Sequence, residues 1–187
     1  MGLDTLPTYI SLLRGINVGG QKKIKICELQ VLYESLGFNQ VKTYIQSGNL
    51  VFNSDIYSAE EIEKLIEEKI KEVFNLDVSV IVRTRNEFKQ IIQRNPFLKE
   101  KASERDKLHV TFLLNIPNDQ SVRKLNLVKD KDEDYKVIGK EVYLYCPNGY
   151  GRTKLTNSIF EAKLNVKATT RNWMTVNKLS KIAEVLK

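Results

Sequence analysis

The chain has 187 residues, of which 42% are hydrophobic, and a formal net charge of +7. This length suits one domain or two small associated halves with a real core, and no apolar run approaches the ~20 residues that span a bilayer. Residues 1–7 lack a charged segment followed by an apolar one, so we expect no signal peptide and a cytoplasmic location.

The first half of the sequence predicts alternating strands and helices. In chain order the patterns indicate a strand at 8–13, a helix at 25–36, strands at 41–46 and 50–53, a helix from the capping residue Ser58 to Phe74, and a strand at 78–83. We expect the second helix to bury one stripe of side chains: Ile62, Leu65, Ile66, Ile70 and Val73. The β-α-β-β-α-β order over residues 1–85 is that of a ferredoxin-like fold.

The same order returns after a connector at residues 86–106, where Asn86 is expected to cap a short helix. The patterns then indicate a strand at 107–114, a helix at 119–128, strands at 134–138 and 141–146, a helix at 154–164 and a strand at 167–170. A last helix starts near Asn172. We therefore predict an α+β protein with an internal duplication: two ferredoxin-like halves, 1–85 and 107–187, joined by a helical connector, with a C-terminal helix.

Each such half leaves one sheet face without helices. Alternation along the strands assigns Tyr9, Tyr44, Gln46, Tyr143 and Tyr145 to that face. Tyrosines there either stack on bases or pack against another layer, and we favour packing because the aromatic signature of RNA-recognition modules is missing from the sequence.

The positive charge is unevenly spread along the chain. Residues 1–134 hold 20 Lys and Arg against 20 Asp and Glu, whereas residues 135–187 hold 10 against 3. A basic region of this kind indicates an anionic partner, either nucleic acid or a phosphate-bearing small molecule, or else a solvated surface that favours solubility.

Three loops combine glycine with polar or cationic residues. Loop 14–20 contains Arg14, Gly15 and Asn17, and its glycines free backbone N–H groups to approach an anion. The second, Ser47-Gly48-Asn49, has an ordinary turn as its alternative. Loop 147–154, with Gly149, Gly151, Thr153 and Lys154, lies between a strand and a helix; it is either a phosphate cradle or a long turn in which Thr153 caps the helix.

Catalytic candidates are few. We interpret His109 as a structural residue in mid-strand, and Cys146 as a conceivable nucleophile beside loop 147–154 without a visible activating base. Cys27, Cys146 and His109 fit no metal-site spacing, so we expect no metal. Arg171 and Asn172 are expected at the start of the last helix. The positive charge of Arg171 is electrostatically unfavourable there unless an anion or carboxylate lies close to it.

Segments 12–20, 43–49 and 170–173 closely resemble a bacterial family called domain of unknown function 1697. The resemblance implies a two-part α+β protein built from ferredoxin-like halves, with no established activity. The positions that it marks as recurrent are Arg14, Gly15, Asn17, Ser47, Gly48, Asn49, Lys154, Arg171 and Asn172. Polar loop residues of this kind suggest a site rather than a core.

The leading hypothesis is a protein that binds an anionic, phosphate-bearing ligand at these loops. The alternatives are an enzyme that acts on a phosphorylated small molecule, a nucleic-acid-binding protein, and an interaction protein in which the loops are only turns. The sequence indicates no particular cofactor and no oligomeric state.

Overall fold

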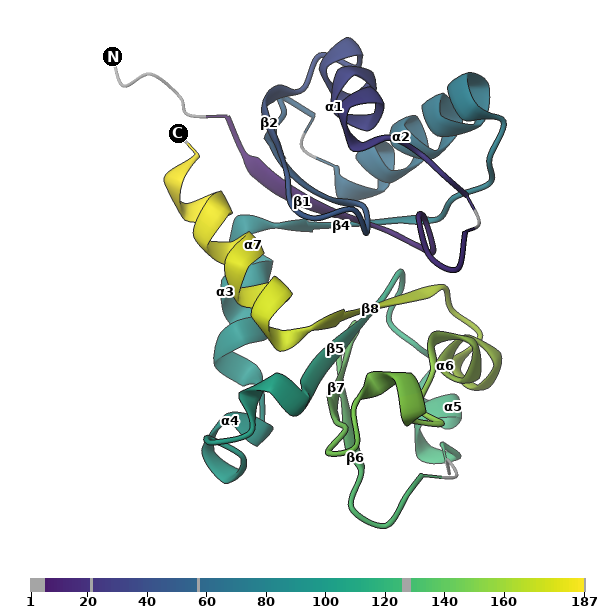
Figure 1. Ribbon diagram of the computed structural model, residues 1–187, viewed down its shortest axis with the longest axis vertical. Helices are drawn as coiled ribbons and strands as arrows, with labels where there is room; N and C mark the ends of the chain where they lie inside the picture. The colour runs from purple at the N-terminus through teal and green to yellow at the C-terminus, as the bar shows by residue number, and fades with distance from the viewer. Residues whose placement is uncertain (1–5, 21, 57, 126–128, 187) are drawn as a thin grey trace. The chain divides into compact units, whose positions relative to one another are not determined.

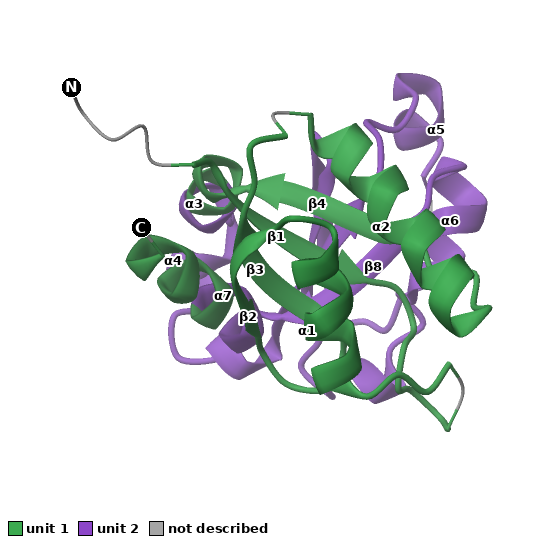
Figure 2. Ribbon diagram, turned by 90° about the horizontal axis from the view of Figure 1, so that it is seen from above, with its two compact units in different colours: residues 1–90, 178–187 green, residues 91–177 purple. Residues whose placement is uncertain are grey.

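The computed structural model describes residues 6–20, 22–56, 58–125 and 129–186. The described chain is a mixed α/β protein with two four-stranded antiparallel sheets and seven α-helices (Figure 1). It divides into unit 1, residues 1–90 and 178–187, and unit 2, residues 91–177 (Figure 2). The predicted α+β class is confirmed. None of the described helices has the length and apolar character of a membrane span.

Unit 1 follows the predicted element order. Its elements are β1 (Thr8–Leu13), α1 (Ile26–Ser35), β2 (Asn39–Thr43), β3 (Asn49–Asn53), α2 (Ala59–Phe74) and β4 (Val80–Thr84). The strands lie in the order β2-β3-β1-β4, and α1 and α2 cover one face of this sheet (Figure 1). Loops 14–20 and 44–48 therefore belong to the same unit.

An aromatic cluster fills the core between this sheet and its helices. The Phe52 ring stacks on Phe38 with centroids 4.4 Å apart and lies 6.1 Å from Tyr9. Tyr9 thus lies on the helix-covered face, and its assignment to the opposite face was wrong. Alternation groups Tyr9 with Ser11 and Leu13 correctly, but it does not say which of the two faces the helices cover.

Helix α2 begins where the sequence indicates, and α3 begins differently. Ser58 Oγ accepts a hydrogen bond from the Glu61 N–H at 3.2 Å, as a capping box requires. Helix α3 (Arg85–Arg94) is capped by Thr84 and not by Asn86. Thr84 Oγ1 accepts from the Glu87 N–H, and the Glu87 carboxylate accepts from the Thr84 N–H at 2.7 Å. This reciprocal pair of hydrogen bonds fixes the first residue of α3 at Arg85, one residue before Asn86, the expected cap.

Unit 2 repeats the strand order in a second sheet. Its elements are α4 (Phe97–Glu100), β5 (Leu108–Leu113), α5 (Asp119–Arg123), β6 (Asp134–Ile138), β7 (Glu141–Tyr145), α6 (Asn157–Leu164) and β8 (Ala168–Asn172), and α7 (Trp173–Val185) follows. The strands lie in the order β6-β7-β5-β8. Phe160 and Leu164 of α6 pack on Leu113 and Leu144 of the sheet.

Two helices of unit 2 are shorter than their patterns suggest. The helix expected at 119–128 ends at Arg123, and residues 126–128 lie outside the described part of the chain. The helix expected from residue 154 begins at Asn157, because Thr156 and not Thr153 caps it by accepting from the Ile159 N–H. Strand β8 runs on to Asn172, so Arg171 is a strand residue.

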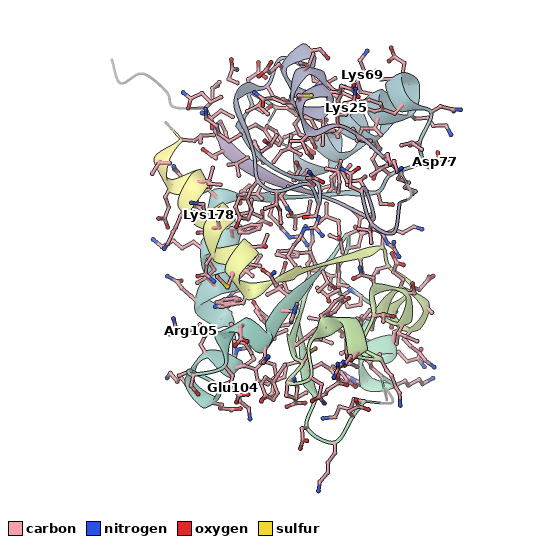
Figure 3. The ribbon with its side chains drawn as sticks, in the orientation of Figure 1. Lys25, Lys69, Asp77, Glu104, Arg105 and Lys178 are labelled. Carbon is pink, nitrogen blue, oxygen red and sulfur yellow. The ribbon has the colours of Figure 1, made fainter. Side chains whose placement is uncertain are left out.

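Tyr143 and Tyr145 lie on the face of the second sheet away from α6, as predicted. The Tyr143 hydroxyl donates to the Ile91 carbonyl at 3.0 Å, and the Tyr145 hydroxyl donates to Glu104 at 2.7 Å. Glu104 lies in the segment after α4 (Figure 3). The hydrogen bond to Glu104 raises the pKa of Tyr145 to about 12. Both rings are packed beneath the connector, since each is at most 6% exposed.

Candidate functional site

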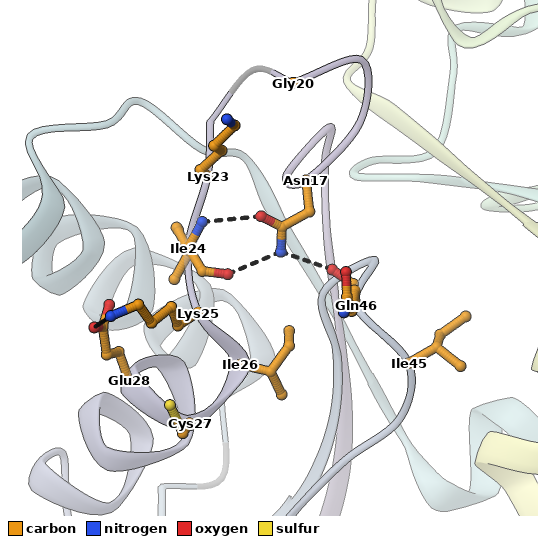
Figure 4. A pocket seen from close by; sticks show the side chains of 10 residues that line it. All are labelled: Asn17, Gly20, Lys23, Ile24, Lys25, Ile26, Cys27, Glu28, Ile45 and Gln46. Atoms are coloured by element: carbon orange, nitrogen blue, oxygen red, sulfur yellow. Dashed lines mark hydrogen bonds and ion pairs between the residues drawn. The ribbon is translucent and has the colours of Figure 1, made fainter.

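In unit 1, the loop after β1 is held against the turn before β3. Asn17 makes three hydrogen bonds: its amide donates to the carbonyls of Gln46 at 2.8 Å and Ile24 at 2.9 Å, and its carbonyl oxygen accepts from the Ile24 N–H (Figure 4). The Leu13 N–H also donates to the Gly48 carbonyl at 2.8 Å. Asn17 therefore ties together three stretches of chain, which leaves its amide group engaged by the protein itself.

Gly48 packs tightly against Leu13 at the end of β1 and Ile16 of loop 14–20. Its φ is +71°, and a Cβ there would lie 2.7 Å from Leu13 Cβ and 2.8 Å from Ile16 Cδ1. The neighbouring Asn49 is buried and donates to the Tyr44 carbonyl at 3.1 Å and to Ser47 Oγ at 2.9 Å. Ser47, Gly48 and Asn49 thus build the turn that supports loop 14–20.

Arg14 and Gly15 lie at the end of β1. Arg14 is half-buried, and its backbone N–H donates to the Ser79 carbonyl at 2.8 Å. Gly15 is exposed, with φ +68° and open space where a Cβ would point. The structure therefore brings all six predicted residues of unit 1 into one pair of loops.

A hollow of about 990 Å³ opens beside these loops; we call it the basic hollow. Its lining comes from loop 14–20, the turn before β3 and the start of α1: Asn17, Gly20, Lys23, Ile24, Lys25, Ile26, Cys27, Glu28, Ile45 and Gln46 (Figure 4). Lys25 pairs with Glu28 at 3.2 Å. Within the described residues, Lys23 has no ion-pair partner.

The first turn of α1 forms one wall of the basic hollow. Lys25 takes the N-cap position in an extended conformation, and its side chain makes no capping hydrogen bond. The first N–H groups of a helix have no intrahelical acceptor and carry the positive end of the helix dipole. The lining therefore combines a helix N-terminus with Lys23 and Lys25, and both features favour an anion electrostatically.

In unit 2, loop 147–154 is a compact turn. Gly149 has φ +85°, and residues Tyr150–Arg152 form one turn of 3-10 helix. Thr153 is buried, and its hydroxyl accepts from the Leu155 N–H at 3.0 Å. Gly151 and Lys154 are exposed, and Lys154 Nζ lies 3.9 Å from Asp130.

Tyr150 links this loop to the sheet of unit 2. Its hydroxyl donates to Thr170 Oγ1 at 3.0 Å, and Thr170 in turn donates to Asn157 at 2.6 Å. The Tyr150 ring stacks on His109 with centroids 5.0 Å apart. Burial lowers the pKa of His109, which keeps the ring neutral at pH 7. These contacts agree with a structural role for the histidine.

The sequence suggested that Arg171 lies at the start of the last helix, but this prediction was wrong. Arg171 lies inside β8 opposite Val110, on the sheet face away from Thr170 and Tyr150, because the β-branched run before it extends the strand. Its guanidinium donates to Thr169 Oγ1 at 2.8 Å, and burial lowers its pKa to about 10. Asn172 is exposed and caps α7 by accepting from the Thr175 N–H at 2.7 Å.

Cys146 does not have the surroundings of a nucleophile. Its side chain is fully buried, and burial raises the pKa of the thiol to about 11, so the thiol is protonated at neutral pH. The described residues contain no group of three or more His, Cys, Asp or Glu arranged to hold a metal ion.

The sequence profile of a family described as "Protein of unknown function (DUF1697)" matches residues 6–143. The chain belongs to this family. A solved structure, the conserved bacterial protein SP0830 from Streptococcus pneumoniae, is similar to this chain with a TM-score of 0.70 and 24% identity, over 95% of this chain and 99% of that one. At this identity the likeness shows a shared fold. No curated protein matches.

The DUF1697 match contains both loops that border the basic hollow and ends before loop 147–154. It includes Lys23 and Lys25, which sequence reasoning missed as site residues. The available signal was the run Lys22-Lys23-Ile24-Lys25, which follows the loop glycines and immediately precedes a helix. The net charge of residues 1–134 is zero, so a total over this stretch does not reveal the local run of lysines.

Proposed function

We propose that this DUF1697 protein binds a small anionic, phosphate-bearing ligand in the basic hollow of unit 1. The observation that carries the proposal is a hollow of about 990 Å³ bordered by Lys23 and Lys25 next to a loop held by Asn17. Ligand sites are typically concave, largely preformed and lined by a few convergent polar groups among apolar ones. Here the apolar walls come from Ile24, Ile26 and Ile45.

The residues divide into two roles under this proposal. Lys23 and Lys25 supply charge to the anion, together with the first N–H groups of α1. Asn17 and Gly48 position the loops without touching the ligand. The Ser47 hydroxyl accepts a hydrogen bond from Asn49 in the turn, and Cys146, the nucleophile candidate from the sequence, stays protonated at neutral pH. This favours binding over the enzyme alternative.

A ligand screen tests the proposal. Thermal shift and calorimetry with inorganic phosphate, sugar phosphates, nucleotides and short RNA are run at two salt concentrations. The variant Lys23→Ala/Lys25→Ala is expected to bind a phosphate compound at least about tenfold more weakly, since a hydrogen bond to a charged group is worth about 1.5–3 kcal/mol.

The matched control is Lys64→Ala/Lys89→Ala, which removes the same charge from exposed positions outside the hollow. Equal losses in the two variants would mean that net charge and not the hollow attracts the anion. Stabilisation by RNA alone that disappears at high salt would replace the proposal with nucleic-acid binding.

We also propose that the chain arose by internal duplication, with ferredoxin-like halves at 1–85 and 107–187 and a connector at 86–106. The support is the matching sheet order and register. Ile10 of β1 pairs with Arg83 of β4, and Val110 of β5 pairs with Arg171 of β8. Each arginine is followed by a residue that caps the next helix.

A reducing compartment, the cytoplasm, is proposed for this protein. Cys27 and Cys146 are both free thiols, and Cys27 is exposed. Exposed unpaired thiols suit a compartment that keeps cysteines reduced. Cell fractionation with an antibody to the native protein tests this assignment.

A further inference from the structure

A second cavity in unit 1, of about 430 Å³, lies between α1 and α2; we call it the apolar groove. Seven residues line it: Cys27, Glu28, Val31, Leu32, Ser35, Val73 and Phe74. Val31 is 63% exposed and Val73 is 53% exposed. Val73 was expected in the core stripe of α2, and its exposure shows that the amphipathic pattern continues past the point where the sheet covers it.

The apolar groove adjoins the basic hollow. Cys27 and Glu28, in the first turn of α1, line both cavities. The Glu28 carboxylate pairs with Lys25 at 3.2 Å, so the acidic charge at the junction is balanced. Lys23, on the side of the hollow, has no such partner within the described chain. The two cavities thus meet at the first turn of α1, one with lysines in its lining and the other with mainly apolar side chains.

We propose that the ligand is an anionic amphiphile, specifically a single-chain alkyl phosphate, whose headgroup occupies the basic hollow and whose chain lies in the apolar groove. This inference rests on the proposed function and adds the chemical class of the ligand. The lysines and the start of α1 recognise the phosphate. Val31, Leu32, Val73 and Phe74 cover the alkyl chain, which removes apolar surface of both ligand and protein from water.

Calorimetry with two probes separates the headgroup from the chain: methyl phosphate, and octyl phosphate below its micelle concentration. Octyl phosphate is expected to bind the wild-type protein at least about tenfold more tightly, because burial of its additional methylene groups removes apolar surface from water. In Val31→Ser/Val73→Ser the advantage of octyl phosphate is expected to fall to within about threefold, with methyl phosphate affinity unchanged.

The control variant is Val185→Ser, because Val185 is 74% exposed on α7 and lies outside the groove. It is expected to keep the full advantage of octyl phosphate. All three replaced valines are exposed, so the variants are expected to fold, which circular dichroism verifies. An advantage that survives in Val31→Ser/Val73→Ser overturns the assignment of the chain to the groove.

The remaining outcomes distinguish the two proposals. If methyl phosphate binds as tightly as octyl phosphate, the proposal of an amphiphilic ligand is wrong, and the proposed anion site in the basic hollow is unaffected. Octyl phosphate that binds equally to the wild type and to Lys23→Ala/Lys25→Ala overturns the anion site and the headgroup assignment together. Sedimentation with phosphatidylglycerol vesicles, without binding of monomeric octyl phosphate, overturns the proposal in favour of a membrane surface.

Cys27 provides a second readout at the junction. It is exposed whereas Cys146 is buried, so a neutral alkylating reagent such as iodoacetamide should label Cys27 first in the folded protein. Saturating octyl phosphate is expected to slow this labelling at least about fivefold, by covering both cavities that the thiol borders. Labelling that continues at the unliganded rate overturns the proposed path of the chain.

Discussion

At the scale of single residues, Gly48 shows how one position sets the geometry of the site. It combines a left-handed backbone, φ +71°, with a Cβ direction that is blocked by Leu13 and Ile16. Gly15 has nearly the same φ, +68°, but nothing within 4 Å of its Cβ position. The two glycines therefore differ in crowding and hardly at all in backbone strain.

Gly48→Ala is expected to destabilise the protein by about 2–5 kcal/mol, because the left-handed penalty of about 1–2 kcal/mol adds to overpacking of about 1–3 kcal/mol. Gly15→Ala is expected to lose only the stability that corresponds to the left-handed penalty, about 1–2 kcal/mol. Urea denaturation of both variants measures the difference. Equal losses would show that Leu13 and Ile16 move aside without cost.

His109 gives the protein a specific pH dependence. Burial lowers the pKa of His109 in the folded state, so between that value and 6.5 the unfolded chain binds the proton more readily. Stability from this group is full above pH 6.5 and is lost as the pH falls towards the folded pKa. His109 is the single histidine of the chain, which makes the effect assignable.

We expect the free energy of unfolding to fall between pH 7 and pH 5.5, and to fall less in His109→Gln. Most carboxylates titrate below this window and contribute little to it. Urea denaturation at the two pH values checks both proteins. A pH dependence that is unchanged in His109→Gln would show that another group is responsible.

At the scale of helices and strands, glutamates of α2 accept hydrogen bonds from backbone N–H groups at the outer edge of the first sheet. Strand β4 is an edge strand, and its Val82 and Val80 N–H groups donate to Glu63 and Glu67, each at 2.8 Å. The edge strand β8 of unit 2 also has a backbone N–H that a helix glutamate accepts: the Ala168 N–H donates to Glu161 of α6 at 3.0 Å. Covering an exposed edge in this way prevents pairing with another chain.

Glu63→Ala is expected to cost about 1–3 kcal/mol of stability, because it leaves the buried Val82 N–H without its acceptor. Glu68→Ala, at an exposed position of the same helix, is expected to stay within about 0.5 kcal/mol of the wild type. Thermal melts and light scattering measure stability and aggregation together. Wild-type behaviour of Glu63→Ala would mean that water replaces the carboxylate at no cost.

Sequence patterns predicted the elements well and their surroundings less well. Period-two and capping signals located β1 and α2 to within a residue, since both signals are local. The face of Tyr9 and the exposure of Val73 depend on what covers each surface, which is set by contacts far away in the chain. Arg171 was misplaced because a strand and a helix start compete for the same few residues.

The candidate site was predicted in part for the same reason. Glycine and asparagine in loop 14–20 indicate special backbone geometry, and the structure shows that Asn17 and Gly48 supply it. That signal marks where loops are built tightly and does not tell a positioning residue from one that touches a ligand. Lys23 and Lys25 carry no backbone signature, so only the fold reveals that they border a hollow.

At the scale of the whole molecule, the chain leaves unit 1 after residue 90 and returns to it at residue 178. The returning segment is the second part of α7, with Leu179 and Ala183 fully buried. Unit 1, which holds both cavities, is therefore assembled from two distant parts of the sequence. Its stability depends on residues that no continuous N-terminal fragment contains.

Leu179→Ala is expected to destabilise the protein by about 2–5 kcal/mol, the usual cost of removing a fully buried leucine side chain. Val185→Ala, on an exposed position of the same helix, is expected to change stability by less than about 0.5 kcal/mol. Amide hydrogen exchange locates the effect: β1 and β4 should lose protection in Leu179→Ala, because the segment that contains Leu179 belongs to unit 1. Loss confined to β5 and β8 would assign that segment to unit 2 instead, whereas equal loss in all four strands would show that the units unfold as one cooperative body.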